Sequence, residues 1–187
     1  SRSYELGWNY IDDTKSFSVT GFYTDYKNFI EELQYIGRDP NTNYMIYQAV
    51  NLGKSKVYGV EAKAHMDLFT IQGGSGVIGI NGSIAYAKGK EKATNNPINN
   101  VEPLTAVIGV DYNYLDQFYL GARLKAVQGK KAKDINLSEP NSGGFPADGL
   151  QPTAGYTTVD IIAEYKPRRD ITINAGLYNI FNREYTS

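Results

Sequence analysis

Residues 104–127 read LTAVIGVDYNYLDQFYLGARLKAV, and this stretch decides the fold. On both sides of a short break at 115–117, apolar and polar residues alternate with a period of two. That period places every second side chain on the same face of a β-strand. The stretch therefore predicts two antiparallel strands joined by a tight turn, with one apolar face and one polar face.

The same alternation recurs along most of the 187 residues. It predicts eight strands, at 4–11, 17–26, 57–66, 77–87, 104–114, 118–127, 156–165 and 171–178. The third strand can begin earlier, near Tyr44. The fold class expected is all-β, an antiparallel up-and-down arrangement.

One face of these strands carries no charge, although 21% of all residues are charged. The other face mixes Gly, Ser, Thr and Asn with charged residues, which suits a wet lumen; the charged ones are Glu5, Glu61, Lys63, Asp111, Arg123, Lys125, Asp160 and Glu164. A soluble sandwich also alternates, but its outer face is rich in Lys and Glu, and its buried face is seldom so rich in Ala, Gly and Tyr. A charge-free face is typical of lipid contact in a transmembrane β-barrel.

The connections alternate in length as well. Short ones are predicted at 12–15, 68–75, 115–117 and 166–170, and long ones at 28–45, 88–103 and 128–155. In a meander this puts the short turns on one rim and the long loops on the other, as in outer-membrane barrels. Aromatic residues near the strand ends predict interfacial girdles, or alternatively cross-strand packing in a soluble sheet; they are Tyr10, Tyr86, Tyr112, Tyr114, Phe118 and Tyr165.

Composition excludes several functions. There is no Cys and a single His, His65, so thiolate metal sites and most His-based catalysis are hard to build. Lys and Arg number 19 against 20 Asp and Glu, which leaves no basic excess for nucleic acid. No Ser-His-Asp or Cys-His set is present, so we expect no enzyme, no catalytic residue, no metal site and no cofactor. The opening Ser1-Arg2-Ser3 lacks a leader pattern and indicates an internal or mature segment.

Four motifs in order resemble TonB-dependent outer-membrane receptors. They are SRSYELG at 1–7, GFYTDYKNFI at 21–30, VYGVE at 57–61 and YNIFNREY at 178–185. The resemblance implies a barrel of about 22 strands around an N-terminal plug, located in the bacterial outer membrane. Residues 1–187 then form a partial barrel domain of about eight strands, and we expect the plug and the last strand to be absent from it.

Two of these regions, AGLYNIFN at 175–182 and YTTVD at 156–160, are most similar to haem, haemoglobin or haemophore receptors, and ferric-siderophore receptors share much of them. The implied function is energy-dependent uptake of haem or another iron source. The implied partners are outer-membrane lipid, the plug, the TonB complex, and haem, a haem-carrier protein or a ferric siderophore. Haem or a ferric chelate is then cargo, and its decisive ligands would lie upstream of Ser1.

Candidate site residues fall into two groups. In the long loops, Arg38, Asp39, Tyr44 and Phe145 are candidates for ligand contact. On the polar face, Glu5, Glu61, Arg123, Asp160 and Glu164 either hold a plug through charge-assisted hydrogen bonds or belong to a satisfied lumen network of neighbouring strands.

Other polar residues favour structural roles. His65 is expected to be a hydrogen-bonded residue at the short-turn end rather than a haem ligand. Asp111, Asn113 and Asp116 lack the EF-hand spacing and indicate a turn. Two rival functions remain open at this stage: a soluble β-rich adhesion or carbohydrate-binding module, and a diffusion porin.

Overall fold

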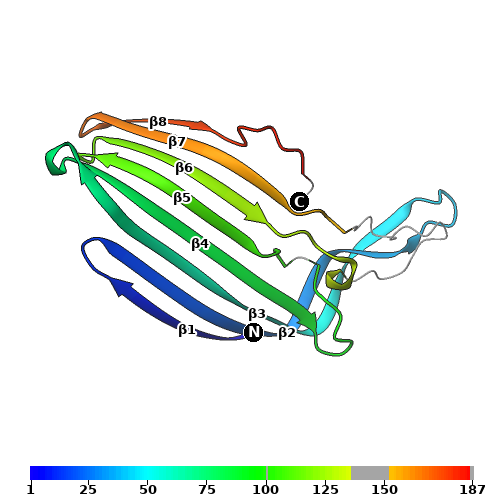
Figure 1. The fold of residues 1–187 in the computed structure, drawn as a ribbon. Coiled ribbons are helices and arrows are strands. Elements are labelled where there is room, and N and C mark those ends of the chain that lie inside the picture. Colours follow the sequence, from blue (N-terminus) through cyan, green and yellow to red (C-terminus); the bar gives the residue numbers. More distant parts are fainter. Residues whose placement is uncertain (100, 136–151, 186–187) are drawn as a thin grey trace.

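The computed structural model describes residues 1–99, 101–135 and 152–185 (Figure 1). The strands are β1 (Arg2–Ile11), β2 (Lys15–Arg38), β3 (Met45–Ile71), β4 (Gly76–Glu91), β5 (Thr105–Tyr114), β6 (Phe118–Val127), β7 (Tyr156–Arg168) and β8 (Ile171–Leu177). Two single-turn 3₁₀ helices, η1 (Gln72–Gly74) and η2 (Ala132–Asp134), lie in connections. Among the described residues, no helix is long and apolar enough to span a membrane.

The eight strands form one sheet in the order β1 to β8, and every neighbouring pair is antiparallel. The sheet is a simple meander, which confirms the predicted all-β up-and-down fold. It curves like part of a wall and does not close (Figure 1). β1 pairs only with β2 and β8 only with β7, so the sheet has two open edges.

The strand register confirms the predicted division into two faces. One row of direct partners runs Trp8, Val19, Ala62, Ile84, Ala106 and Ala126 across β1 to β6. The next row toward the turns contains Ala64, Gly82, Ile108, Leu124 and Val159. Large apolar side chains on this face are exposed: Leu6 is 83% exposed, Trp8 58% and Ile108 52%. No second layer of the described chain packs on this apolar face.

The large accessible surface of the chain also indicates that the apolar face is uncovered. The described chain exposes 12950 Å², whereas a compact soluble protein of this mass exposes roughly 8,900 Å². Among the described residues, the buried apolar side chains of the core are Ile98, Val127 and Ile135, all near the long loops. The sheet is therefore a wall that needs a further partner on its apolar face.

The height of the apolar face matches a bilayer. On β4 its positions run from Gly76 to Tyr86, and the next outward residue is Lys88. At a rise of about 3.4 Å per residue and a strand tilt of about 45°, this stretch spans roughly 24 Å, close to the apolar band of about 25 Å in outer-membrane barrels.

Both ends of this apolar face carry aromatic rows. Toward the turns, Tyr114, Phe118 and Tyr165 are successive cross-strand partners. Toward the long loops, Tyr4, Tyr23 and Tyr58 form the matching row. The rows lie where interfacial girdles are expected; their contact with headgroups stays a prediction.

The two rims differ as predicted. The connections 12–14, 72–75, 115–117 and 169–170 lie together at the left of Figure 1, and the described residues of the connections 39–44, 92–104 and 128–155 lie at the right. In the β5–β6 turn, Leu115 and Asp116 have φ values of 50° and 55°, and the Gln117 amide donates to the Tyr114 carbonyl at 2.9 Å. Two successive positive φ values match the twist of the flanking strands.

The predicted long connection at 28–45 is wrong. β2 continues to Arg38 and β3 begins at Met45, so the true loop is only 39–44. β1 reaches only to Asp25 and β4 only to Ser55, so the residues beyond these points pair with each other and project past the sheet as a hairpin (Figure 1). Four register shifts between Tyr26 and Gly37 explain the error, because each shift breaks the period-two pattern.

If the apolar face contacts hydrocarbon, a charge placed on it is costly. We expect Ile84→Lys, in the middle of that face, to destabilise the folded protein in a bilayer by about 2–4 kcal/mol. The neighbouring Ala85→Lys is the control, because Ala85 points to the polar face opposite Glu61 and Thr105. Urea unfolding of the intact protein in vesicles measures both, and equal effects of the two lysines would contradict lipid contact.

Gly59, inside the motif at 57–61, occupies a position where a side chain has no room. A Cβ there would lie 2.2 Å from the Tyr86 carbonyl oxygen and 2.7 Å from the Phe22 ring, which covers the glycine. We expect Gly59→Ala to destabilise the protein by about 1–3 kcal/mol through overpacking. Gly21→Ala, where the nearest atom is 3.9 Å away, should be nearly neutral in the same unfolding measurement. Similar losses for both would refute the packing argument.

Candidate functional site

The polar face of the sheet carries all five residues predicted for the lumen. Cross-strand pairing places Glu61 opposite Thr20 and Ala85, and Glu5 opposite Phe22 on the other side of β2. The remaining three lie on β6 and β7, several strands away. The structure therefore brings the five to one face but divides them into two groups.

The β6–β7 group has mostly local partners. Arg123 and Asp160 are direct cross-strand neighbours, but the Asp160 carboxylate accepts the Asn179 amide at 2.7 Å. Glu164 pairs with Lys166 on its own strand at 2.7 Å. Both carboxylates thus have partners within the described chain. Contact of either one with a plug stays a prediction.

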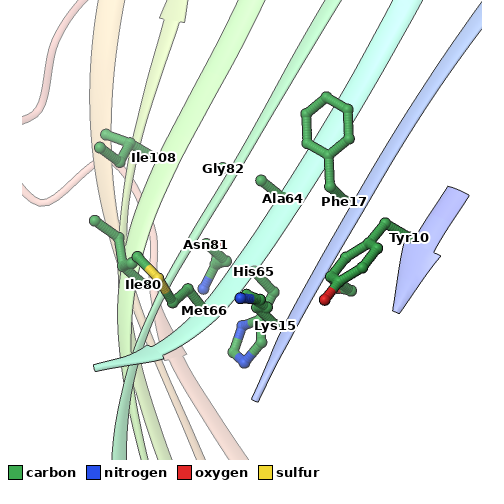
Figure 2. Close-up of a pocket in the computed structure, with 11 residues that line it drawn as sticks. Tyr10, Lys15, Phe17, Ala64, His65, Met66, Ile80, Asn81, Gly82 and Ile108 are labelled. Carbon is green, nitrogen blue, oxygen red and sulfur yellow. The ribbon is translucent and has the colours of Figure 1, made fainter. Parts of the chain in front are cut away.

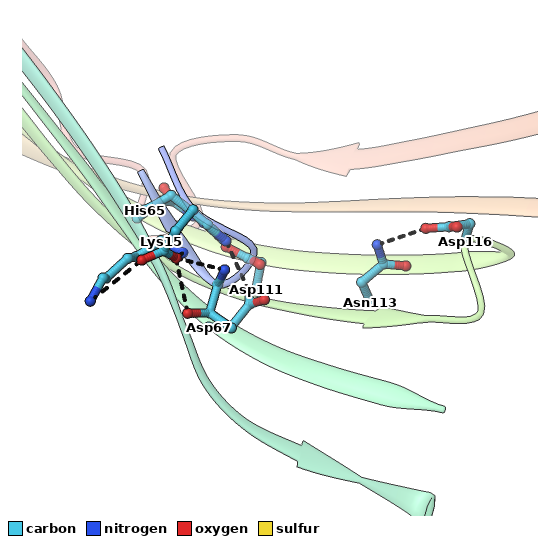
Figure 3. Close-up of polar contacts among 9 residues, drawn as sticks. Lys15, His65, Asp67, Asp111, Asn113 and Asp116 are labelled. Carbon is cyan, nitrogen blue, oxygen red and sulfur yellow. Dashed lines mark hydrogen bonds and ion pairs between the residues drawn. The ribbon is translucent and has the colours of Figure 1, made fainter. Parts of the chain in front are cut away.

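A second polar cluster on this face was not predicted as a unit (Figure 3). His65 Nε2 lies 3.0 Å from Asp67 Oδ1, and the Asn81 amide donates to the Asp111 carboxylate. One residue of each pair lies next to Gly79: a Cβ on this glycine would be 2.9 Å from Asp111 and 2.9 Å from His65. Alternation alone puts these residues on one face. Their proximity depends on the β3–β5 register, which the sequence pattern does not fix.

The cluster does not form a metal centre. Among the described residues, no three acidic or His side chains come together in a way that could hold a metal ion. His65 lies near the short turns with a carboxylate partner, as expected. Asn113 donates to Asp116 at 3.3 Å beside the β5–β6 turn (Figure 3), which fits the turn interpretation of these residues.

At the loop rim, the tip of the β2–β3 hairpin contains three of the predicted contact residues. Arg38 donates to the Asn43 carbonyl at 2.9 Å. The Asp39 carboxylate accepts the Asn41 and Thr42 amides at 2.8 and 2.9 Å, and these hydrogen bonds hold its pKa below the usual value. Arg38 and Asp39 therefore shape the tip itself.

Tyr44, at the end of the same loop, is 76% exposed. Phe145, the fourth candidate, lies outside the described residues.

The apolar face also contains a shallow groove of about 370 Å³ (Figure 2). Phe17 and Tyr10 form one side and Met66, Ile80 and Ile108 the other. The floor is low because Ala64 and Gly82 are small cross-strand partners. Its lining is almost wholly apolar, so it suits a hydrocarbon chain and offers little to orient a polar cargo.

Residues 1–180 match the family model described as TonB dependent receptor-like, beta-barrel. The chain is 31% identical over 193 residues to the hemoglobin-haptoglobin-binding protein A of Haemophilus influenzae, covering 99% of this chain and 18% of that protein. It is 28% identical over 198 residues to the probable hemoglobin and hemoglobin-haptoglobin-binding protein 4 of the same species, covering 99% and 20%. The chain thus spans about a fifth of the length of these curated relatives.

A solved structure titled copper transporter OprC superimposes on 98% of this chain and 26% of its own, with a TM-score of 0.76 and 23% sequence identity. That likeness concerns the fold alone. Together with the two-faced meander, the exposed apolar face and the unequal rims, the family match leads to one conclusion: the chain belongs to the TonB-dependent receptor-like β-barrel family.

Proposed function

We propose that this chain is part of the wall of a bacterial outer-membrane receptor that takes up haem or another iron source. The observation that carries the proposal is the apolar face of the sheet, which is exposed, uncharged and about as tall as the apolar part of a bilayer. The opposite face is polar and carries clusters of charged residues. Lipid covers the first face and a wet, plugged lumen adjoins the second. The work is selective binding and energy-dependent transport, with no covalent catalysis.

The open edges support a larger barrel. β1 and β8 present unpaired main-chain groups, which hydrocarbon cannot satisfy. Since the chain spans about a fifth of its relatives, further strands of the same receptor are the natural partners of these edges. The plug then faces Glu5, Glu61, Arg123, Asp160 and Glu164, and the TonB complex acts from the short-turn side.

Haem carried by haemoglobin is the favoured cargo. Both reported relatives bear names that specify haemoglobin binding, and the chain matches them over nearly its whole length. A ferric siderophore is the second candidate, because the regions at 156–160 and 175–182 also resemble such receptors. A soluble adhesion or carbohydrate-binding module fits poorly, since it would leave residues such as Trp8 and Leu6 in water.

Growth on defined iron sources tests this function. An iron-starved strain that depends on the intact receptor should grow on haemoglobin and on free haem. Growth on a ferric siderophore alone would favour the second candidate. Stable, monodisperse protein extracted without detergent would overturn the membrane receptor altogether.

The hairpin tip supplies a sharper measurement. Tyr44→Ala should weaken haemoglobin binding by on the order of tenfold if this exposed ring is a contact residue. Asp13→Ala, in the exposed 12–14 turn of the opposite rim, is the control and should leave binding unchanged. Equal effects, or no effect of the Tyr44 substitution, would remove the tip from the binding surface.

The tip should also show a defined pH response. Because the folded-state pKa of Asp39 is lowered, its ionised carboxylate stabilises the tip at every pH above the ordinary value of about 3.9. That stabilisation should be lost only as the pH falls through the lowered pKa. The amide signal of Thr42 in an NMR titration reports this step; an inflection at or above 3.9, or one that persists in Asp39→Asn, would contradict it.

A further inference from the structure

The groove on the apolar face lies close to the rim of short turns. Tyr10, Phe17, Ala64, Gly82 and Ile108 are successive cross-strand partners on β1 to β5 and form one row across it. Ala64 and Gly82 are the small members of this row, and the larger side chains stand on either side of them (Figure 2). The floor of the groove is therefore the hydrogen-bonded backbone of β3 and β4, which cannot collapse to close the space.

A groove with a fixed floor has to be filled by something outside the chain. Its volume of about 370 Å³ is within the usual range of ligand sites, roughly 300–1,000 Å³. If it stayed empty, its lining would lose the dispersion contacts that a filling group provides. Because all lipid tails are as apolar as this lining, the groove alone gives no preference for one lipid over another. A preference has to come from polar groups at its end.

Charged side chains of both signs lie at the end of the groove nearest the β1–β2 turn. Lys15 lines the groove and is the cross-strand partner of Met66. Its ammonium group lies 3.5 Å from the Asp12 carboxylate and 5.8 Å from the centre of the Tyr10 ring. The Tyr10 hydroxyl donates to the same carboxylate at 2.8 Å. Tyr10 therefore connects the apolar lining to a pair of opposite charges.

The turn fixes the position of Asp12 more firmly than that of Lys15. The backbone amides of Thr14 and Lys15 each donate to Asp12 Oδ1 at 2.9 Å, and the Thr14 amide is the main cause of the lowered pKa of Asp12. Asp12 is thus a fixed negative charge at neutral pH. The Lys15 side chain is 51% exposed, and its 3.5 Å contact with Asp12 is longer than a charge-assisted hydrogen bond. Its ammonium group is therefore free to turn toward a second anion.

We propose that the groove binds one acyl chain of a phospholipid in the leaflet on the short-turn side, and that the headgroup of this lipid carries both a phosphate and a free ammonium group, as in phosphatidylethanolamine. The phosphate contacts Lys15 and the ammonium group contacts Asp12. A headgroup with a phosphate and no ammonium group fits less well, because its net negative charge would lie beside Asp12. The inference rests on the proposed function, since the groove meets lipid only in a membrane-inserted wall.

Native mass spectrometry of the intact receptor tests the headgroup. The protein is released from micelles that contain equal amounts of dioleoyl phosphatidylethanolamine and dioleoyl phosphatidylglycerol, which differ only in the headgroup. We expect preferential retention of the ethanolamine lipid, and Lys15→Gln should reduce that retention by roughly five-fold. The matched control is Lys166→Gln, which removes the same charge near the same rim from a side chain that pairs with Glu164 of the polar face. It should leave retention unchanged.

A second pair of variants tests the groove without changing any charge. Ala64→Leu fills the floor with an apolar side chain, and we expect it to abolish the preferential retention. The matched control is Ala122→Leu, which makes the same change on the apolar face of β6, between Val110 and Ile161 and outside the groove. This variant should keep the preference.

Each other outcome overturns the proposal. Equal retention of the two lipids, or a preference for the glycerol lipid, would remove the headgroup assignment. A preference that survives both Lys15→Gln and Ala64→Leu would place the lipid elsewhere, and equal losses within either matched pair would show a general effect. A receptor dimer that retains no lipid would assign the groove to a second copy. If these failures occur while haemoglobin-dependent growth and the need for detergent persist, only the lipid site falls; if detergent is not needed, the proposed function falls as well.

Discussion

The main constraint on this molecule is that an apolar face must be covered while every strand keeps its hydrogen-bond ladder. Water does not stabilise a surface on which Trp8, Leu6 and Ile108 are all exposed, and the described chain offers no second layer to cover them. Hydrocarbon can cover the apolar face, but it cannot form hydrogen bonds with unpaired main-chain groups. A continuous antiparallel meander meets both demands everywhere except along β1 and β8, each of which pairs with only one described strand.

The period-two pattern was sufficient to predict the strands and their faces. From Trp8 to Ala126, outward-facing partners line up across six strands as alternation required. The pattern failed where the backbone departs from regular pairing. Register shifts in β2 hid the hairpin beyond Asp25. The cluster around Gly79 and the groove over Ala64 and Gly82 depend on which residues lie opposite each other, and that information belongs to pairs of strands rather than to one strand.

The same distinction between one strand and a pair of strands applies to the predicted site residues: their faces could be predicted, but their hydrogen-bond partners could not. Face assignment was correct for Glu5, Glu61, Arg123, Asp160 and Glu164, because a face follows from parity along one strand. Partners could not be predicted: Asp160 receives the Asn179 amide, although Arg123 lies directly across from it. At the hairpin tip, loop chemistry explains Asp39, whose carboxylate accepts neighbouring amides as such residues do in turns.

The hairpin that projects past the sheet is connected to it through two strands. Beyond Asp25 and Ser55, β2 and β3 pair with each other and not with β1 or β4. An insertion or deletion near the hairpin tip therefore changes the reach of the loop rim while leaving the pairing of the other six strands as it is.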